Sequence, residues 1–245
     1  MRDSLRAYLL LLIWQLHRFK RFLPLIVIIQ LALAVGIVYG LAFLIPHIDP
    51  QSALFLATGA PTITLLIMGL TFVPQEVSQG KLTGRFAYLS SLPIPRLATL
   101  ASDVTFWLIA QIPGTALALL VASLRFRFAL HVSWTVIPAV LLVALSGASV
   151  GYALAMLAHP RVAQEVSSFV SIGILLFSPV DFPMSRLPSA LRAIHTVLPI
   201  KYMADLIRWS LTGRFVERPA LAFVVVAAWC AAGLATSYRL AVKRR

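Results

Sequence analysis

The sequence predicts an all-α polytopic membrane protein with six transmembrane helices, from its composition and from its hydropathy pattern. Hydrophobic residues make up 60% of the 245 residues and charged residues only 12%, whereas a soluble domain has about 45–50% and about 25%. The hydrophobic residues form six runs, and the length of each run is close to the roughly 20 residues that a membrane-spanning helix needs. These runs are too long for barrel strands and lack their strict alternation. A soluble globular protein, a disordered chain and a collagen-like repeat are therefore excluded.

A single transmembrane domain is expected over residues 1–245. The first run is interrupted only by Gln30 and two glycines, and the fifth has only 17 residues, which is at the short limit for a crossing. The predicted spans are approximately 23–45, 53–73, 104–124, 134–158, 162–178 and 220–237.

Six spans place both termini on one side of the membrane, and basic residues indicate which side. Lys and Arg number 21 against 8 Asp and Glu, a formal net charge of +13. In so apolar a chain this excess is typical of membrane-flanking loops, not of a surface for nucleic acid. Arg18, Lys20 and Arg21 precede the first span, and no Lys or Arg lies between it and the second. We therefore expect a multi-pass protein of the cytoplasmic (inner) membrane with both termini in the cytoplasm, and no nucleic-acid partner.

Residues 1–21 are predicted to form an interfacial helix. An apolar stripe at helical spacing has basic residues mostly off it, and no cleavage site of the Ala-x-Ala type follows. Such a helix lies on the cytoplasmic leaflet and contacts membrane lipid. The alternative is that residues 7–16 extend the first span. The stripe consists of Leu5, Leu9, Leu12, Leu16 and Phe19.

Residues 76–100 form a connection that is too long for a plain turn between neighbouring helices. Leu82, Phe86, Leu89 and Leu92 are spaced as one apolar helical stripe, and the Pro93-Ile94-Pro95 segment then ends the helix. The pattern predicts a short amphipathic helix that could dock into the groove of a partner. A helix that merely rests on lipid is the alternative.

Residues 179–213 are predicted to form outer re-entrant or interfacial helices between the fifth and sixth spans. Prolines at 179 and 183 interrupt the fifth span, and Pro188 suits the first turn of a short helix that Pro199 ends. A second short helix follows over 201–212, with Gly213 as its C-cap. An unstructured loop is the alternative.

Several kinds of chemistry are missing from the sequence. The Gly80-Lys81 pair is followed by Leu82, so there is no Walker-type phosphate loop, and the five histidines lack a metal-ligand spacing. No ionisable residue occupies the middle of a span, so we expect an external energy source and an apolar or amphipathic cargo. The polar residues inside the spans that are candidates for a translocation path are Gln30, Thr62, Thr64, Gln111 and Ser149.

Residues 147–151 read Gly-Ala-Ser-Val-Gly, which resembles the nucleophile motif of intramembrane serine proteases. A serine nucleophile needs a base, and the sixth span contains no histidine, lysine or carboxylate. The same two glycines form a small-residue face for close helix packing. We therefore interpret the motif as a packing feature, with an intramembrane enzyme as the weakest alternative.

Two connections carry motifs of a known family. Gln75-Glu76-Val77-Ser78-Gln79-Gly80-Lys81-Leu82 and Leu89-Ser90-Ser91-Leu92-Pro93-Ile94-Pro95-Arg96 resemble the entry and exit of the coupling loop in type-2 ATP-binding-cassette (ABC-2) exporter permeases. Ser178-Pro179-Val180-Asp181-Phe182-Pro183 and Leu198-Pro199-Ile200-Lys201-Tyr202, with Arg208, resemble the segment before the final helix of that family. Asp181 departs from the uncharged residues that the family favours there.

This resemblance implies a permease with no catalytic site, no bound metal and no cofactor of its own. ATP and Mg would be bound by two cytosolic ABC ATPase subunits, and a second permease chain, identical or related, would complete the transporter. The cargo would be a drug, an antibiotic or a lipid-like molecule, and residues 78–95 would be the coupling helix. The residues implied in coupling to the ATPase are Glu76, Gly80, Lys81, Leu82, Arg85, Phe86 and Leu89. A stand-alone secondary carrier or channel is the main alternative.

Overall fold

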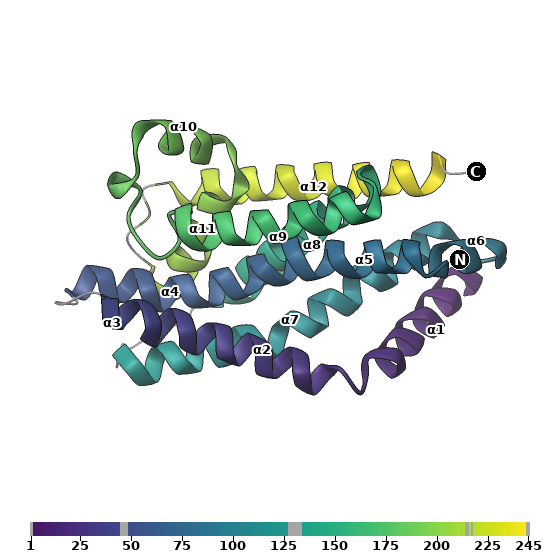
Figure 1. The fold of residues 1–245 in the computed structure, drawn as a ribbon, viewed down its shortest axis with the longest axis horizontal. Coiled ribbons are helices and arrows are strands. Elements are labelled where there is room, and N and C mark those ends of the chain that lie inside the picture. The colour runs from purple at the N-terminus through teal and green to yellow at the C-terminus, as the bar shows by residue number, and fades with distance from the viewer. Residues whose placement is uncertain (1, 45–48, 127–133, 214–215, 217, 244–245) are drawn as a thin grey trace.

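The computed structural model describes residues 2–44, 49–126, 134–213, 216 and 218–243. Throughout this part of the chain, all regular secondary structure is helical. Figure 1 shows a long bundle in which both chain termini and α6 (Arg85–Ser91) lie at one end, here called the terminal end. The opposite end carries α10 (Ser189–Val197) and the start of α4 (Pro50–Ile67) and is here called the cap end (Figure 1).

The helices follow one another with short connections. Two π-helical turns, labelled η1 and η2, interrupt the long helices, Pro61 and Pro113 lie inside long helices, and η3 is a single 3₁₀ turn. The elements are α1 (Arg2–Phe19), α2 (Leu23–Val35), η1 (Gly36–Leu41), α3 (Ala42–Leu44), α4 (Pro50–Ile67), η2 (Met68–Phe72), α5 (Val73–Leu82), α6 (Arg85–Ser91), α7 (Arg96–Phe126), α8 (Val136–Leu157), α9 (Pro160–Phe177), η3 (Met184–Arg186), α10 (Ser189–Val197), α11 (Pro199–Thr212) and α12 (Pro219–Lys243).

In the described part of the chain, five helical segments are long and apolar enough to cross a membrane, namely Leu23–Leu41, Pro50–Leu82, Arg96–Phe126, Val136–Leu157 and Pro219–Leu240. They match five of the six predicted spans and confirm a multi-pass architecture. The predicted fifth span forms α9, which is not among them, because its first half contains Arg161, Gln164 and Glu165. A sixth crossing therefore stays a prediction.

Helix α9 nevertheless links the two ends of the bundle. Near the terminal end, Gln75 of α5 donates a hydrogen bond to the hydroxyl of Ser168 at 3.4 Å. At the cap end, the ring of His195 in α10 is hydrogen-bonded to the carbonyl oxygen of Phe177 at 3.0 Å. The chain thus runs from one end to the other along α9.

The central helix of the bundle is the continuous segment from α4 through η2 to α5, which has 33 residues and is 83% buried over its most apolar window. At 1.5 Å per residue it is about 50 Å long, well beyond the about 30 Å of a bilayer core. The second predicted span ended at residue 73, whereas the helix continues to Leu82. Pro74 does not end it, because the wider turn η2 precedes this proline, which has no amide hydrogen to donate.

The Gly-Ala-Ser-Val-Gly segment of α8 packs against the central helix. A Cβ atom on Gly69 would lie 2.6 Å from the backbone of Gly147, and one on Gly151 would lie 2.0 Å from the carbonyl oxygen of Gly69. The hydroxyl of Ser149 donates to the carbonyl oxygens of Ser146 at 3.0 Å and Cys230 at 3.4 Å. These contacts confirm the packing interpretation of the motif, since its glycines let two helix backbones touch.

The cap end contains the two short helices predicted in the long outer connection. Helix α10 begins after Pro188 and ends before Pro199, and α11 ends at Gly213, whose φ of 65° suits a glycine C-cap. Whether these helices re-enter the membrane or lie on its surface stays a prediction.

Candidate functional site

The connection between α5 and α7 contains a sharp break at Gly84. Gly84 has a φ of 76°, a left-handed conformation that glycine adopts without strain. The predicted stripe of one amphipathic helix is therefore wrong, because Leu82 belongs to α5 whereas Phe86 and Leu89 belong to α6. Leu82 is 49% exposed. Phe86 and Leu89 are partly buried against the protein.

Two further apolar side chains near this break are exposed, in addition to Leu82. Tyr88 of α6 is 64% exposed and lies close in sequence to Leu82. Leu97, in the first turn of α7, is 61% exposed. Leu82 belongs to the predicted coupling set, whereas Tyr88 and Leu97 do not, and the part of that set in coupling stays a prediction.

Behind this surface, four charged side chains from four helices form a cluster, here called the charge cluster. Arg18 pairs with the Glu76 carboxylate, and Arg85 lies 3.7 Å from the same carboxylate oxygen and 3.9 Å from an oxygen of Asp103. Two arginines balance two carboxylates in a largely buried setting, where an unpaired charge would be costly. The cluster ties α1, α5, α6 and α7 together.

Gly80 provides the space that the charge cluster needs. A Cβ atom on Gly80 would lie 2.6 Å from Nε of Arg85 and 2.8 Å from one of its terminal nitrogens. The arginine side chain therefore passes over α5 at the one position in that turn that has no side chain. This contact gives a physical reason for the Glu-x-x-x-Gly spacing of Glu76 and Gly80.

Asp103 joins α1 and α8 to the same cluster. Its carboxylate accepts a hydrogen bond from the Gln15 amide at 2.7 Å and from the Tyr152 hydroxyl at 3.3 Å. Gln15 also donates to the hydroxyl of Ser102 at 3.2 Å. Asp103 directly precedes the predicted third span at 104–124, and ionisable residues in membrane helices are often functional.

Helix α1 is docked against α7 through this polar contact and an aromatic one. Gln15 is 3% exposed, although the sequence pattern placed it off the apolar stripe. Phe19 stacks on Phe106 with ring centroids 4.7 Å apart. By contrast, Leu5 is 60% exposed and Leu9 is 47% exposed, so part of the predicted apolar stripe faces outward, where lipid would contact an interfacial helix.

Burial and the neighbouring positive charge of Arg85 lower the pKa of Arg18 to about 10. The guanidinium remains protonated at neutral pH despite this shift. Arg18 therefore keeps its positive charge opposite Glu76.

A cavity of about 460 Å³ lies beside the charge cluster, where α1 meets α2 and both face α5, α7 and α9. We call it the elbow pocket. Aromatic rings from Phe19, Phe22, Phe72 and Trp107 form much of its wall. The polar part of the wall consists of Arg18, Gln75, Glu76, Gln79 and Gln164. An apolar wall with a polar side suits an amphipathic ligand.

The five residues predicted for a translocation path are all buried and do not line this cavity. The side-chain nitrogen of Gln30 donates to the carbonyl oxygen of Ala110 at 3.1 Å. A Cβ atom on Gly114 would lie 2.1 Å from the side-chain oxygen of Gln30. Thr62, Thr64, Gln111 and Ser149 each donate to a backbone carbonyl of their own helix. Their part in translocation stays a prediction.

At the cap end, Arg208 of α11 is the centre of a second polar cluster, whose contacts the sequence did not predict. It is 2% exposed and donates to the carbonyl oxygen of Val180 at 2.7 Å, to the hydroxyl of Thr58 at 3.2 Å and to the Asp205 carboxylate at 3.1 Å. Its guanidinium also lies 4.0 Å from the ring centroid of Phe55. One side chain thus holds α11 and the chain after α9 against α4.

Asp181 lies beside this second cluster, against the backbone of Gly59. A Cβ atom on Gly59 would be 1.9 Å from Oδ1 of Asp181, and that oxygen has no hydrogen-bond partner among the described residues. Burial raises the pKa of Asp181 to about 7, although the charge of Arg208 acts in the opposite direction. The carboxyl group therefore changes its charge near neutral pH.

The match with known proteins agrees with this arrangement. The family model of the ABC-2 type transporter matches residues 6–212, which include most of α1, the charge cluster and both short helices of the cap end. The chain therefore belongs to the ABC-2 type transporter family. No curated protein sequence matches it significantly.

Membership in this family makes the chain a transport component, namely the membrane domain of an ABC transporter. Such domains pair with ABC ATPase subunits. The resemblance inferred from the two connections is thereby confirmed at the level of the family.

Proposed function

We propose that this chain is the permease subunit of an ATP-driven exporter that moves a drug, an antibiotic or a lipid-like amphiphile across the cytoplasmic membrane. Two permease chains, identical or related, and two ATPase subunits would form the transporter, and the ATPases would bind ATP and Mg. The six crossings would leave both termini in the cytoplasm. The family supports the general class, and the charge cluster is the single observation that carries the coupling mechanism.

The charge cluster explains how a push on α6 could reach the membrane-spanning helices. Arg85 anchors α6 to Glu76 of the central helix and to Asp103 of α7. Buried, hydrogen-bonded charges resist separation because each would be left unpaired in a poorly solvated site. A movement of α6 would therefore carry α1, α5 and α7 with it, which is the rigid-body kind of transition that switching proteins use.

The elbow pocket supports the proposed class of cargo. Its cavity of about 460 Å³ falls within the about 300–1,000 Å³ of ordinary ligand pockets. Aromatic side chains would contact the apolar part of the cargo, and the glutamines would hydrogen-bond its polar part. Arg18 and Glu76 of the charge cluster also line the pocket. A cargo bound in the pocket could therefore alter the ion pairs of the cluster.

Affinity purification of the chain from its native membranes in mild detergent, followed by an ATPase assay, tests the proposed coupling. We expect a soluble ATPase to co-purify and to be lost from the Leu82→Asp/Tyr88→Asp variant, because these two side chains are exposed on the proposed docking surface. The matched control is Leu157→Asp, which also introduces a charge at an exposed leucine, with 64% exposure. It should retain the ATPase.

Two residues of the coupling set that the resemblance implies, Phe86 and Leu89, provide a second comparison with the docking variant. Phe86 and Leu89 are partly buried against the protein, so their change to Asp should disturb the fold of α6 as well as docking. Recovery of the chain alone, with full transport activity driven by an ion gradient, would refute the exporter and support a stand-alone carrier.

A further inference from the structure

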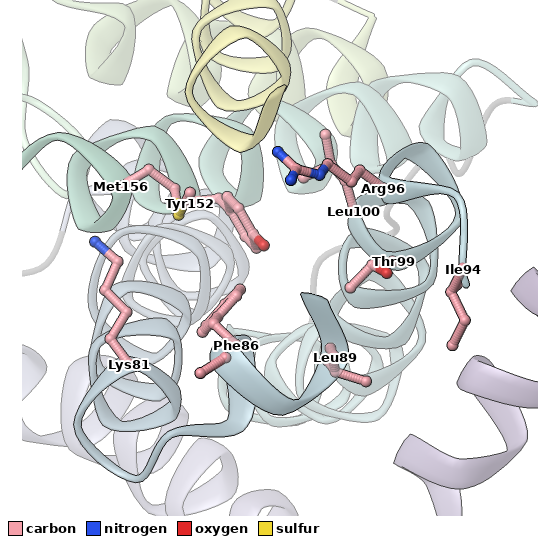
Figure 2. A pocket seen from close by; sticks show the side chains of 10 residues that line it. Lys81, Phe86, Leu89, Ile94, Arg96, Thr99, Leu100, Tyr152 and Met156 are labelled. Carbon is pink, nitrogen blue, oxygen red and sulfur yellow. The ribbon is translucent and has the colours of Figure 1, made fainter. Parts of the chain in front are cut away.

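Cavities outside the elbow pocket differ in the charge of their walls. One cavity, of about 250 Å³, lies behind α6, and its lining includes Lys81 and Arg96 but no carboxylate. Figure 2 shows Phe86 and Leu89 of α6 on its wall. Another cavity, of about 370 Å³, lies at the cap end and has the carboxyl group of Asp181 in its wall. We call it the cap pocket.

The cap pocket lies between three segments that are distant in the sequence. Leu41 of η1 forms one part of its wall, and Ser52 and Leu56 of α4 form another. The cavity volume of about 370 Å³ falls within the about 300–1,000 Å³ of ordinary ligand pockets. The connection between α9 and α10 contributes Asp181, Phe182, Pro183, Arg186 and Leu187. Most of the wall is therefore apolar.

Asp181 lacks a compensating charge in this wall. Its side chain is 8% exposed and forms no ion pair among the described residues, and its Oδ1 atom lies against Gly59 without a hydrogen-bond partner there. Arg208 attracts the Asp181 carboxylate, but its own ion pair is with Asp205, at 3.1 Å. One positive charge thus faces two negative charges. A buried carboxylate without a partner is costly, so a cation in the cap pocket would be stabilised.

The exposed charges near the cap pocket do not reverse this preference. Arg186 lines the pocket but is exposed, and water and salt screen an exposed charge more strongly than a buried one. Asp49 places an exposed carboxylate near Ser52, which holds the pKa of that carboxyl group below its usual range. These two exposed charges have opposite signs, so the buried carboxylate of Asp181 determines the charge of the preferred ligand.

A positive charge and a compact apolar group define the complementary ligand. We propose that the cap pocket binds a small lipophilic ammonium ion, with its charge beside the Asp181 carboxylate and its apolar group against Leu41 and Leu56. Because Oδ1 is closed off by Gly59, the ligand would approach the part of the carboxyl group that lines the pocket. The aromatic ring of Phe182 would add a surface that attracts cations. The proposal goes beyond the proposed export and does not depend on it.

Equilibrium dialysis of the protein with its co-purifying partners, in phosphatidylcholine nanodiscs without ATP, tests this site. The probe is tritiated phenylbutylamine at pH 8, where it is protonated, because an alkyl ammonium group has a pKa near the value of about 10.4 for lysine. Asp181 is mainly charged at this pH, because its pKa is about 7. We expect saturable binding in excess of that to empty nanodiscs. Phenylbutanol and phenylbutyrate, which have the same apolar group without a positive charge, should not compete.

Two variants test the charge and the cavity separately. Asp181→Asn keeps the size of the side chain and removes its charge, and it should weaken binding at least about tenfold, as expected for a hydrogen bond to a charged group. Leu41→Trp should abolish binding by filling the cavity while the carboxylate remains. Asp49→Asn is the matched control, because Asp49 is an exposed carboxylate outside the lining of the pocket, and it should bind the probe as the wild type does.

Any of four results would overturn the proposal. Equal binding by the wild type and Asp181→Asn would show that the carboxylate does not hold the probe. Unchanged binding by Leu41→Trp would place the probe outside the cap pocket. Competition by phenylbutanol would show that apolar contact alone retains the probe, and competition by phenylbutyrate would show that Arg186 sets the charge preference. Because the assay contains no ATP, none of these results bears on the proposed export.

Discussion

At the scale of single residues, the charge cluster shows which part of the site could be predicted from sequence. Glu76 and Gly80 stand in one short motif, so their spacing could be recognised. The partners of Glu76 and Asp103 come from distant parts of the chain, for example Gln15, which lies 88 residues from Asp103. No local spacing reports such contacts, since only the tertiary fold brings these helices together.

A double-mutant cycle on Arg85 and Asp103 tests the balance of charge. Arg85→Met leaves two buried carboxylates with less compensation, and loss of one partner of a buried pair costs about 3–5 kcal/mol. We expect a marked fall in thermal stability in detergent. The Arg85→Met/Asp103→Asn double variant should recover at least half of that loss, because it removes one carboxylate as well. Strictly additive losses would show that the two side chains are not coupled.

The second residue-scale prediction concerns Asp181 and pH. Its pKa in the folded protein is about 7, raised from 3.8 by burial. The folded state therefore binds the proton more tightly than the unfolded state, and stability from this group is present below about pH 4 and is lost as the pH rises through 7. Over this window the wild type should lose a few kcal/mol that Asp181→Asn does not lose.

Thermal unfolding of both proteins from pH 4.5 to 8, with the difference between them plotted against pH, measures this contribution. Subtraction removes the titration of His195 and of Asp205, which both proteins share. A difference that is independent of pH would contradict the proposed protonation of Asp181.

At the scale of elements, sequence periodicity located the long helices well but could not locate their breaks. The predicted second span ended where polar residues begin, at 74–79, yet α5 continues because a helix can leave the bilayer and remain helical. The amphipathic stripe from Leu82 to Leu92 was also interrupted, since periodicity does not report the backbone angle of Gly84. Prolines were more informative, because Pro188 marked the start of α10 and Pro199 its end, although α11 begins at Pro199 and not at Lys201 as predicted.

Helix packing around Gly69 gives a prediction at this scale. In Gly69→Ala the new methyl group would lie 2.6 Å from the backbone of Gly147, so η2 and α8 would have to separate. We expect a loss of about 1–3 kcal/mol in stability, as for other overpacked sites, measured by thermal unfolding in detergent.

Gly173→Ala is the matched control for this variant. Gly173 lies inside α9 and has open space around its missing side chain. Its change to Ala should be neutral or slightly stabilising, because alanine favours a helix over glycine by about 0.5–1 kcal/mol. A similar effect of both substitutions would show that helix preference, and not contact between α8 and the central helix, determines the result.

At the scale of the whole molecule, the arrangement of the two ends is the feature that sequence predicted best. Both termini and α6 lie at the terminal end, while the short helices α10 and α11 lie at the cap end (Figure 1). The basic residues before the first span adjoin the terminal end, and basic flanks remain in the cytoplasm. The terminal end should therefore face the cytoplasm, and the cap end should face outward.

Single cysteines at the two ends test this orientation. Cys230 is buried and is first changed to Ser, so that the Tyr88→Cys and Ser189→Cys variants each carry one exposed thiol. A membrane-impermeant maleimide should label Ser189→Cys in intact cells, and Tyr88→Cys only in inverted vesicles. Labelling of Tyr88→Cys from outside intact cells would place α6 on the far side of the membrane from any ATPase. In the proposed mechanism the charge cluster would transmit movement only from the side where α6 lies, so that one result would refute the coupling mechanism even if the fold and the family assignment remained correct.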